Sequence, residues 1–324
     1  MAQARLYERA AAEDKSSSLL HASKGVTFWA GIAGHLARHQ GGAPVLLAGL
    51  HGNFRLRLQG TPWVWCRTAI VPPSVWHELD FAGEPFAALY IEQNLGGLNA
   101  PMPLLSITGE IGGVALGNSK EIPLLRPFYE DLSSEHWVEQ ALSDLIAFST
   151  RKISASPLDP RIASIAELLH GRGTGTAPVD QIARHAGLSS SRFQHLFTGQ
   201  VGVPFRRYRA WQRLRIAWQE IASGTSIATA AHASGFFDSA HFAHEYRRTF
   251  GKACFDGAGR RARTTGHAYY RPPDVPPHLR RGGARSTGAS MRGLPDGGNL
   301  PLLNAITLYI WVDSGSLCIC NTIA

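Results

Sequence analysis

The stretch 179–251 constrains the fold more than any other part of the chain, because it contains one pattern twice. In the first copy, Gly187 suits a sharp turn between two short helices, since glycine adopts positive φ at little cost. The serines that follow it suit the N-cap of the second helix. Phe193 and Phe197 then lie four residues apart, on one face of that helix. The first copy therefore predicts a helix-turn-helix unit.

The second copy, residues 226–251, repeats these features around Gly235. Phe242, Tyr246 and Phe250 recur every fourth residue, so they form one apolar stripe on the second helix. The first of these aromatic residues lies seven positions after the glycine, whereas the corresponding separation in the first copy is six. The sequence therefore predicts a second helix-turn-helix unit whose turn is longer by about one residue.

One long helix is expected between the two copies, from Pro204 to Ser223. Proline suits the first turn of a helix, and Gly224 suits its C-terminal cap. A helix of about 20 residues is roughly 30 Å long, and neighbouring major-groove faces of B-DNA lie about 34 Å apart. The predicted helix therefore has the length needed to hold two recognition helices one DNA turn apart. Its apolar face would consist of Phe205, Tyr208, Trp211, Leu214, Trp218 and Ile221.

Three segments, GLSSSRFQHLF, GVPFRRYRAWQRL and IATAAHASGFFDSAHFAHEYRRTFG, are similar to one known family. Together they resemble the DNA-binding domain of the AraC/XylS family of transcriptional regulators, and the resemblance covers residues 159–251. It implies sequence-specific binding to double-stranded operator DNA through two recognition helices in successive major-groove segments. Most members of that family activate transcription, usually through contact with RNA polymerase, so the resemblance also implies an effector-responsive activator.

The N-terminal half contains short apolar runs separated by turn residues, from Val26 to Gln93. In the run Phe54–Leu58 apolar residues alternate with two arginines, which is the period of a half-buried strand. Short strands at this spacing predict a sandwich or a small barrel. The segment AIVPPSVWHELDFAGEPFAALYIEQ resembles the cupin-like sensor barrel that precedes some AraC-type DNA-binding domains. In those proteins the barrel holds a small effector or forms a homodimer.

This second resemblance makes the interior of the barrel a candidate effector pocket, because small β-barrels can enclose a ligand. A tryptophan in a strand belongs more often to the core than to a ligand site, so core packing remains the alternative for each tryptophan. The candidate lining residues are Trp63, Trp65, Trp76 and His77.

We expect an α+β chain of two domains and a tail. A cupin-like β-barrel with flanking helices would occupy residues 1–150, with a loose lead-in over residues 1–24. Residues 151–158 would be a linker, and residues 159–251 an all-α domain of two helix-turn-helix units joined by a long helix. Residues 252–324 depart from the family pattern and are rich in Arg, Gly and Pro up to about Gly298, which predicts a disordered tail.

The charge is unevenly distributed along the chain, whose net charge is +8. Residues 1–157 carry 12 basic and 14 acidic side chains, whereas residues 158–251 carry 11 arginines and 6 acidic side chains. The net charge of +5 on the segment with both units indicates attraction to phosphate. A well-solvated surface remains the alternative.

A recognition helix presents the exposed face of its N-terminal half to base edges, and glutamine can bind adenine through two hydrogen bonds. The candidate base-reading residues are Ser191, Arg192, Gln194 and His195 in the first unit and Ser239, Ala240, Ala243 and His244 in the second. Arginine can position a protein on phosphates without reading sequence. The candidates for this role are Arg206, Arg207, Arg209, Arg213, Arg247 and Arg248. Pairing of some of them with Glu220 or Glu245 remains the alternative.

A cupin-type enzyme or small-molecule-binding protein with a non-functional DNA-binding domain is the alternative function. Cupin metal sites need clustered ligands such as two histidines and a carboxylate, and the N-terminal half contains no His-x-His motif. His241 and His244 have a metal-like spacing, but no third ligand is near them in the sequence. We therefore expect no enzymatic activity, no metal and no cofactor.

The first 15 residues, MAQARLYERAAAEDK, contain charges where a signal peptide needs an apolar run. The apolar run 300–312 is too short for a membrane span of about 20 residues. Both observations predict a cytoplasmic protein without a membrane anchor.

Overall fold

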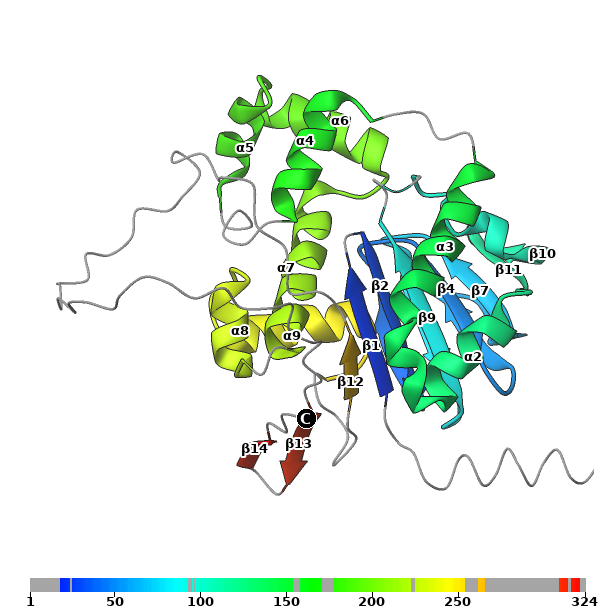
Figure 1. Ribbon diagram of the computed structural model, residues 1–324. Coiled ribbons are helices and arrows are strands. Elements are labelled where there is room, and N and C mark those ends of the chain that lie inside the picture. The colour runs from blue at the N-terminus through cyan, green and yellow to red at the C-terminus, as the bar shows by residue number, and fades with distance from the viewer. Residues whose placement is uncertain are drawn as a thin grey trace, which may run out of the picture.

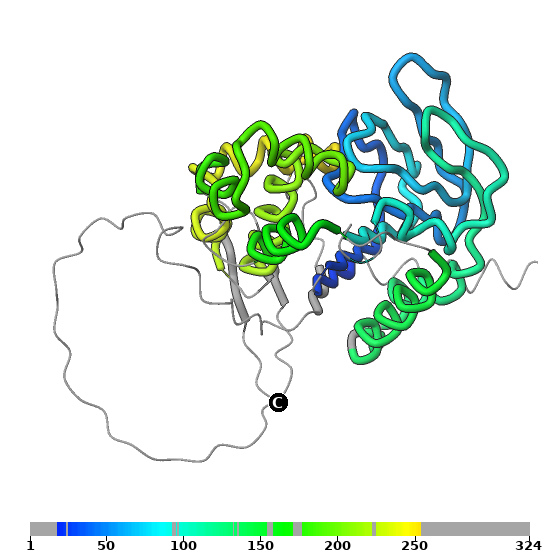
Figure 2. Tube along the Cα trace, turned by 90° about the horizontal axis from the view of Figure 1, so that it is seen from above, coloured from blue at the N-terminus to red at the C-terminus, as the bar shows by residue number. Residues whose placement is uncertain are grey.

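The computed structural model describes residues 18–23, 25–92, 95, 97–153, 158–170, 177–222, 225–253, 262–265, 309–313 and 316–320. Within them the chain forms a β-barrel followed by a group of helices (Figure 1). Figure 2 shows these two halves side by side. The barrel and the all-helical part confirm the α+β class predicted from the sequence.

Two sheets form the barrel. The larger has the strand order β10-β11-β7-β4-β9-β2-β1-β12, and the smaller has the order β3-β8-β5-β6. Neighbouring strands are antiparallel except β1 and β12, which are parallel. The strands are β1 (Ser18–Ser23), β2 (Val26–Ile32), β3 (His35–His39), β4 (Val45–Gly49), β5 (Phe54–Leu58), β6 (Val64–Cys66), β7 (Thr68–Val71), β8 (His77–Asp80), β9 (Pro85–Ile91), β10 (Ser106–Ile111), β11 (Val114–Asn118) and β12 (Ala262–Thr265).

Strand β4 is buried on both faces, which explains its uninterrupted apolar sequence. Val45 and Leu47 belong to the core inside the barrel, where they pack with the smaller sheet. Leu46 and Ala48 point the other way, into a second core beneath two helices. Because side chains alternate between the two faces of a strand, β4 contributes to both cores.

Two helices, α2 (Ile122–Glu130) and α3 (Val138–Arg151), cover the outer face of the larger sheet (Figure 1). Phe128 of α2 meets Phe28 of β2 edge to face, with ring centroids 5.3 Å apart. Leu142 and Leu145 of α3 belong to the same buried core. Two short 3₁₀ helices accompany them, η2 (Met102–Leu104) and η3 (Leu132–His136).

The helical half of the chain contributes to two different cores. Its helices are α4 (Pro160–Leu169), α5 (Val179–His185), α6 (Ser190–Val201), α7 (Phe205–Ala222), α8 (Ile227–Ala233) and α9 (Ser239–Phe250). Helices α4, α5 and α6 share a core with the first turns of α7, around Phe193 and Tyr208. The later turns of α7 continue the core of the barrel together with α8 and α9, through Trp211, Trp218 and Phe242.

Three segments differ from the sequence predictions. Strand β1 lies where a loose lead-in was expected, because buried Leu19 and His21 alternate with half-buried neighbours along β2. The β10–β11 hairpin was not anticipated. In the tail, residues 262–265, 309–313 and 316–320 form strands, the last two being β13 (Tyr309–Asp313) and β14 (Ser316–Cys320), rather than the predicted disordered chain. The other tail residues beyond Ala253 lie outside the described residues.

Candidate nucleic-acid interface

Helices α5 and α6 form the first helix-turn-helix unit. Gly187 has a φ of 66° in the turn between them, which is the left-handed conformation expected of this glycine. Ser189 caps α6, since its hydroxyl accepts a hydrogen bond of 3.3 Å from the N–H of Arg192. Phe193 and Phe197 are fully buried, with ring centroids 5.7 Å apart. The predicted turn and apolar face are therefore present.

Helices α8 and α9 form the second unit with the same geometry. Gly235 has a φ of 85°, and the carboxylate of Asp238 caps α9 by accepting a bond of 2.7 Å from the N–H of His241. Four residues separate α5 from α6, whereas five separate α8 from α9. The prediction that the second turn is one residue longer is confirmed.

Helix α7 joins the units and was predicted over nearly the same residues. It has 18 residues, which corresponds to roughly 27 Å. Pro204 precedes it, and the proline carbonyl accepts bonds from the N–H groups of Arg207 and Tyr208. Helices α5 and α6 lie at one end of α7, and α8 and α9 lie at the other (Figure 1).

The candidate base-reading side chains lie on the outside of α6 and α9. All are exposed except Ala243, which is half-buried. The amide of Gln194 approaches the carbonyl of Ser190 at 3.3 Å, a long bond within its own helix. The structure thus leaves these residues accessible on two equivalent helices, and their contacts with bases stay a prediction.

The candidate phosphate-binding arginines differ among themselves in exposure. Arg206, Arg247 and Arg248 are exposed, whereas Arg209 and Arg213 are half-buried. The guanidinium of Arg209 donates to the carbonyl of Ala177 at 2.9 Å and stacks over the ring of Phe205. The guanidinium of Arg248 lies over the ring of Trp76, 5.6 Å from its centroid.

Arg207 does not fit the predicted phosphate role, because its guanidinium is used inside the protein. Its side chain is buried, donates to the carbonyl of Gln40 and to the hydroxyl of Thr249, and pairs with Glu245 at 3.4 Å. Burial lowers the pKa of Arg207 to about 10. The prediction of a phosphate contact is wrong for this residue, and the alternative, a pair with Glu245, is present.

The end of α9 is bound to the barrel through the backbone of β3. The N–H of Ala37 donates to the carbonyl of Gly251 at 2.8 Å, and the N–H of Gln40 donates to that of Arg248 at 3.0 Å. Gly251 has a φ of 72°, and a Cβ there would lie 2.6 Å from Nδ1 of His39. Only glycine therefore allows α9 to end this close to the strand.

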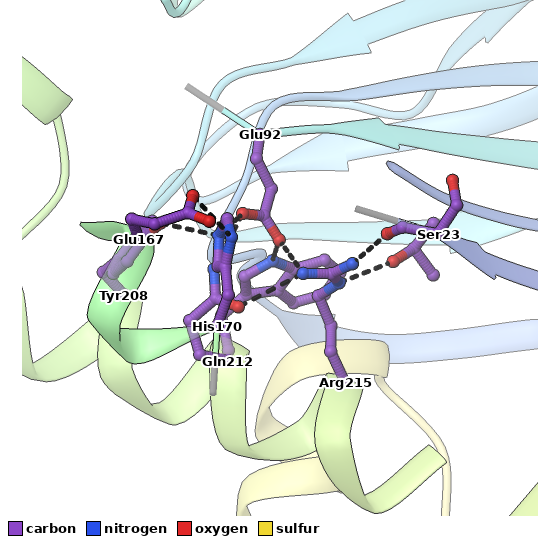
Figure 3. Close-up of polar contacts among 9 residues, drawn as sticks. Ser23, Glu92, Glu167, His170, Tyr208, Gln212 and Arg215 are labelled. Carbon is purple, nitrogen blue, oxygen red and sulfur yellow. Dashed lines mark hydrogen bonds and ion pairs between the residues drawn. The ribbon is translucent and has the colours of Figure 1, made fainter. Parts of the chain in front are cut away.

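Glu92, which follows β9, is the centre of a buried polar network between the barrel and the helices (Figure 3). Its carboxylate pairs with Arg215 of α7 and with Nε2 of His170 at 2.7 Å. It also accepts bonds from the amide of Gln212 at 2.8 Å and from the indole N–H of Trp211 at 3.3 Å. Sequence reasoning missed this network, which holds α7 and the residue after α4 against the barrel.

The network keeps its charge despite being removed from water. Burial alone would raise the pKa of Glu92, but the adjacent guanidinium of Arg215 and the hydrogen bonds from His170 and Gln212 outweigh it, so the pKa falls to about 2. Arg215 in turn donates to the hydroxyl of Thr27 at 3.0 Å and to the carbonyl of Ser23. The ion pair is thus fully hydrogen-bonded, which a buried pair requires.

A largely apolar cavity of about 60 Å³ lies where α7 and α9 close the barrel. Its walls include Val45, Leu47 and Phe86 from the strands and Trp218 and Phe250 from the helices. Lys252 stands among the lining residues, with its ammonium group over the ring of Trp29. The barrel and the second helix-turn-helix unit thus share one cavity.

The residues that line this cavity differ from those predicted for the effector pocket. His77 lines it, but Trp63, Trp65 and Trp76 do not. Trp63 lies under the guanidinium of Arg57 just before β6, and Trp65 within β6 is 64% exposed. Trp76 lies under the guanidinium groups of two arginines at the surface.

Two neutral histidines form the polar part of the cavity wall. His39 and His77 are each 3% exposed, and their ring centroids lie 4.2 Å apart. Nδ1 of each ring lies 2.8 Å from a backbone carbonyl oxygen, of Ala37 and Val75 respectively, so Nδ1 carries the proton. Burial lowers the pKa of His77 to about 4 and that of His39 well below its ordinary value. Each Nε2 is therefore a hydrogen-bond acceptor.

In the described part of the chain, the His, Cys, Asp and Glu side chains form no group of three or more that could hold a metal ion. Cys66 is buried there as a free thiol. None of the helices in the described ranges combines the length and apolar character needed to cross a membrane.

Part of the helical half is similar to a known protein family. A family model described as a helix-turn-helix domain matches residues 182–253. No curated protein sequence matches the chain. Among solved structures, ToxT from Vibrio cholerae is 13% identical, with 70% of this chain and 95% of that chain covered and a TM-score of 0.45.

Two further solved structures are similar to parts of the chain. The structure of wild-type ToxT from Vibrio cholerae bound to an unsaturated fatty acid is 14% identical, with 74% of this chain and 94% of that chain covered and a TM-score of 0.45. An RmlC-like cupin family protein from Methanocaldococcus jannaschii is 13% identical, with 24% and 83% covered and a TM-score of 0.22. The family match and the two units of α5–α6 and α8–α9 together identify residues 182–253 as a helix-turn-helix DNA-binding domain of the AraC type.

Proposed function

We propose that this chain is a sequence-specific transcription regulator that inserts α6 and α9 into successive major-groove segments of its operator. The observation that carries the proposal is the repetition of one geometry at both ends of α7. Both helices have 12 residues, an N-cap side chain and a C-terminal glycine with positive φ. An α7 of roughly 27 Å, plus the offset of each unit from its ends, is compatible with the separation of about 34 Å between major-groove faces.

The proposal is tested by selecting binding sites for the full-length chain from a randomised DNA pool at physiological salt. Two short motifs whose centres lie about 10 base pairs apart are the expected result. Enrichment of a single motif would contradict the use of both helices. Absence of any enrichment by folded protein would contradict sequence-specific binding itself.

Two variants separate base reading from phosphate binding. Gln194→Ala should relax the preference at one base pair, with a loss of about 1–3 kcal/mol against the preferred base. Arg206→Ala, a change at an exposed arginine of α7, should weaken binding to all sequences similarly and reduce the salt dependence by about one phosphate contact. If both variants changed all sequences alike, the assignment of roles would be wrong. The same assay applied to the other base-reading candidates completes the map.

We also propose that the cavity between the barrel and α9 is the effector site. It replaces the tryptophan-lined pocket predicted from the sequence. The neutral rings of His39 and His77, whose Nε2 atoms accept hydrogen bonds, favour a small apolar molecule that carries a hydroxyl or amine hydrogen, because a carboxylate would place its lone pairs against theirs. Lys252 is the group that would favour a carboxylate instead.

The volume of the cavity couples ligand size to regulation. The cavity has a volume of about 60 Å³, and Trp218 and Phe250 form part of its wall. A ligand too large for this volume would displace these side chains from the barrel. Effector binding would in this way alter the position of the second recognition helix.

Benzyl alcohol and benzoate form a matched pair of probes for the effector site. Benzyl alcohol should raise the melting temperature of the full-length protein, and His77→Leu should abolish that rise, whereas the surface change Trp65→Leu should leave it intact. An equal rise with benzoate, lost in Lys252→Met, would show that the lysine selects the ligand. No response to either probe would contradict the effector site without affecting the DNA-binding proposal.

Activation through RNA polymerase and function as a homodimer belong to the same proposal and follow from the family of the DNA-binding domain. In vitro transcription from a promoter that carries the selected site should increase when the protein is added. A decrease would identify a repressor. Sedimentation analysis of the protein with and without the selected DNA distinguishes a monomer from a dimer.

A further inference from the structure

The two helix-turn-helix units can be aligned residue by residue through their backbone hydrogen bonds. The N–H of Leu188 donates to the carbonyl of Ala183 at 2.9 Å in the first unit. The N–H of Phe236 donates to the carbonyl of Ala231 at 2.9 Å in the second. Leu188 and Phe236 therefore occupy the same place, one residue after the glycine of each turn.

The alignment shifts by one residue before the next helix begins. Ser189, the N-cap of α6, follows directly after the residue that donates this bond. Asp238, the N-cap of α9, follows only after one additional residue, Phe237. Phe237 is thus the residue by which the second turn is longer.

The inserted side chain has no place in the protein interior. Phe237 is 83% exposed, more than any other large apolar side chain among the described residues, while its neighbour Phe236 is 3% exposed. Its N–H lies 3.4 Å from Nδ1 of His241, so the backbone of the insertion is joined to the first turn of α9. The ring is therefore accessible to a partner that approaches this turn.

Its position indicates which partner. Phe237 immediately precedes the N-cap of α9, beside exposed Ser239 and Ala240, at the end of a recognition helix that approaches base edges. The opposite end of α9, at Gly251, is the one that touches β3, so docking on the barrel leaves Phe237 uncovered. Phenylalanine contributes to major-groove recognition through apolar contact with the C5-methyl group of thymine.

We propose that Phe237 contacts a thymine methyl group in the DNA segment that α9 faces. The inference rests on the proposed function, namely that α9 is a recognition helix. It also makes the two halves of the operator unequal, because α6 lacks the insertion and offers the polar side chains of Ser191 and Gln194. The half-site of α9 contains a thymine whose methyl group is recognised.

The test starts from the site that the full-length chain selects out of randomised DNA. The half-site of α9 is the one at which His244→Ala changes base preference. Each thymine of this half-site is then replaced singly by deoxyuridine, which removes only the methyl group. At one thymine the wild-type protein should lose about fourfold in affinity, the value for one buried methylene-sized group.

A double-mutant cycle that combines Phe237→Ala with the deoxyuridine substitution decides whether Phe237 contacts the methyl group. This variant should bind the thymine site about as weakly as wild type binds the deoxyuridine site, and it should no longer distinguish the two. Phe148→Ala, a change at an exposed phenylalanine of α3, should retain the full sensitivity of wild type. Thermal unfolding should be unchanged in Phe237→Ala, because this ring is 83% exposed.

Each contrary result has a separate meaning. Retained methyl sensitivity in Phe237→Ala would overturn the inference while the proposed function stands. The exposed ring would then be assigned to contact with a protein partner. A uniform loss at every site would overturn it in favour of a backbone contact. Absence of a selected site for wild type would refute the proposed function, and the inference would fall with it.

Discussion

Replacing Glu92 by glutamine tests how strongly the barrel holds α7. The side chain is 1% exposed, and its partner Arg215 is 5% exposed. Glutamine keeps the shape but removes the charge, so the guanidinium of Arg215 is left buried without a counter-ion. His170 and Gln212 lose a carboxylate acceptor at the same time.

The cost can be estimated in two ways. Removal of one partner from a buried ion pair destabilises a protein by about 3–5 kcal/mol. The pKa of Glu92 falls from 4.5 to about 2 on folding, and at 1.36 kcal/mol for each unit this corresponds to roughly 3 kcal/mol. Both values are a large fraction of the 5–15 kcal/mol that stabilises a typical protein.

The pKa shift also fixes the direction of the pH dependence. Because the folded protein holds the pKa of Glu92 below its unfolded value, the carboxylate contributes its full stability above about pH 4.5. This contribution is lost as the pH falls towards 2, because over this range the unfolded state binds a proton at Glu92 and the folded state does not. Wild type should therefore lose stability over this range more steeply than Glu92→Gln.

Urea unfolding of both proteins at pH 7 and pH 3 measures the effect. Glu110→Gln, at an exposed glutamate of β10, is the matched control and should behave like wild type. The double variant Glu92→Gln, Arg215→Met should be more stable than Glu92→Gln alone, because it removes the unpaired charge. A loss below about 1 kcal/mol for Glu92→Gln would refute the reasoning and indicate that water enters the network.

Other predictions follow from the packing of the two units. Gly251→Ala should lower the free energy of unfolding by at least about 1–2 kcal/mol, because alanine resists positive φ and its Cβ would meet His39; urea unfolding measures it. Phe193→Ala should speed amide exchange in α4–α6 and the first turns of α7, whereas Phe242→Ala should speed it in α8, α9 and the barrel, because the two rings belong to different cores. Burial raises the pKa of the Cys66 thiol to about 12, so a thiol reagent at pH 8 should modify Cys66 only after unfolding.

The sequence predicts the turns, caps and apolar faces of the helical half, because these features depend on neighbours within a few residues. A glycine with positive φ, a capping side chain and aromatic residues at i and i+4 leave the same trace wherever they occur. The extra residue of the second turn was visible as a difference in spacing, and the structure identifies it as Phe237. The β10–β11 hairpin left a signal too, since Gly112 and Gly113 form a Gly-Gly turn directly before the apolar residues Val114 to Leu116.

The contacts between the halves could not be predicted, because they join residues far apart in the chain. Arg215 is 123 positions from Glu92, and Arg207 is 167 positions from Gln40. In the sequence each arginine of α7 looks like a surface charge, so counting charges assigned Arg207 to DNA. The cavity likewise exists only where His39 and His77 meet α9, and neither histidine has a motif that marks it.

Unequal packing of the two units has a consequence for regulation. The first turns of α7 belong to the separate core of α4–α6, while its later turns, with α8 and α9, continue the core of the barrel. A ligand that widens the cavity presses on Phe250 and Trp218, which belong to the second unit and the helix that carries it. Among the residues that line that cavity, none comes from α5 or α6. An effector should therefore change binding at the half-site of α9 more than at the half-site of α6, and measuring the preference at both half-sites with and without ligand would separate this coupling from a uniform loosening of the protein.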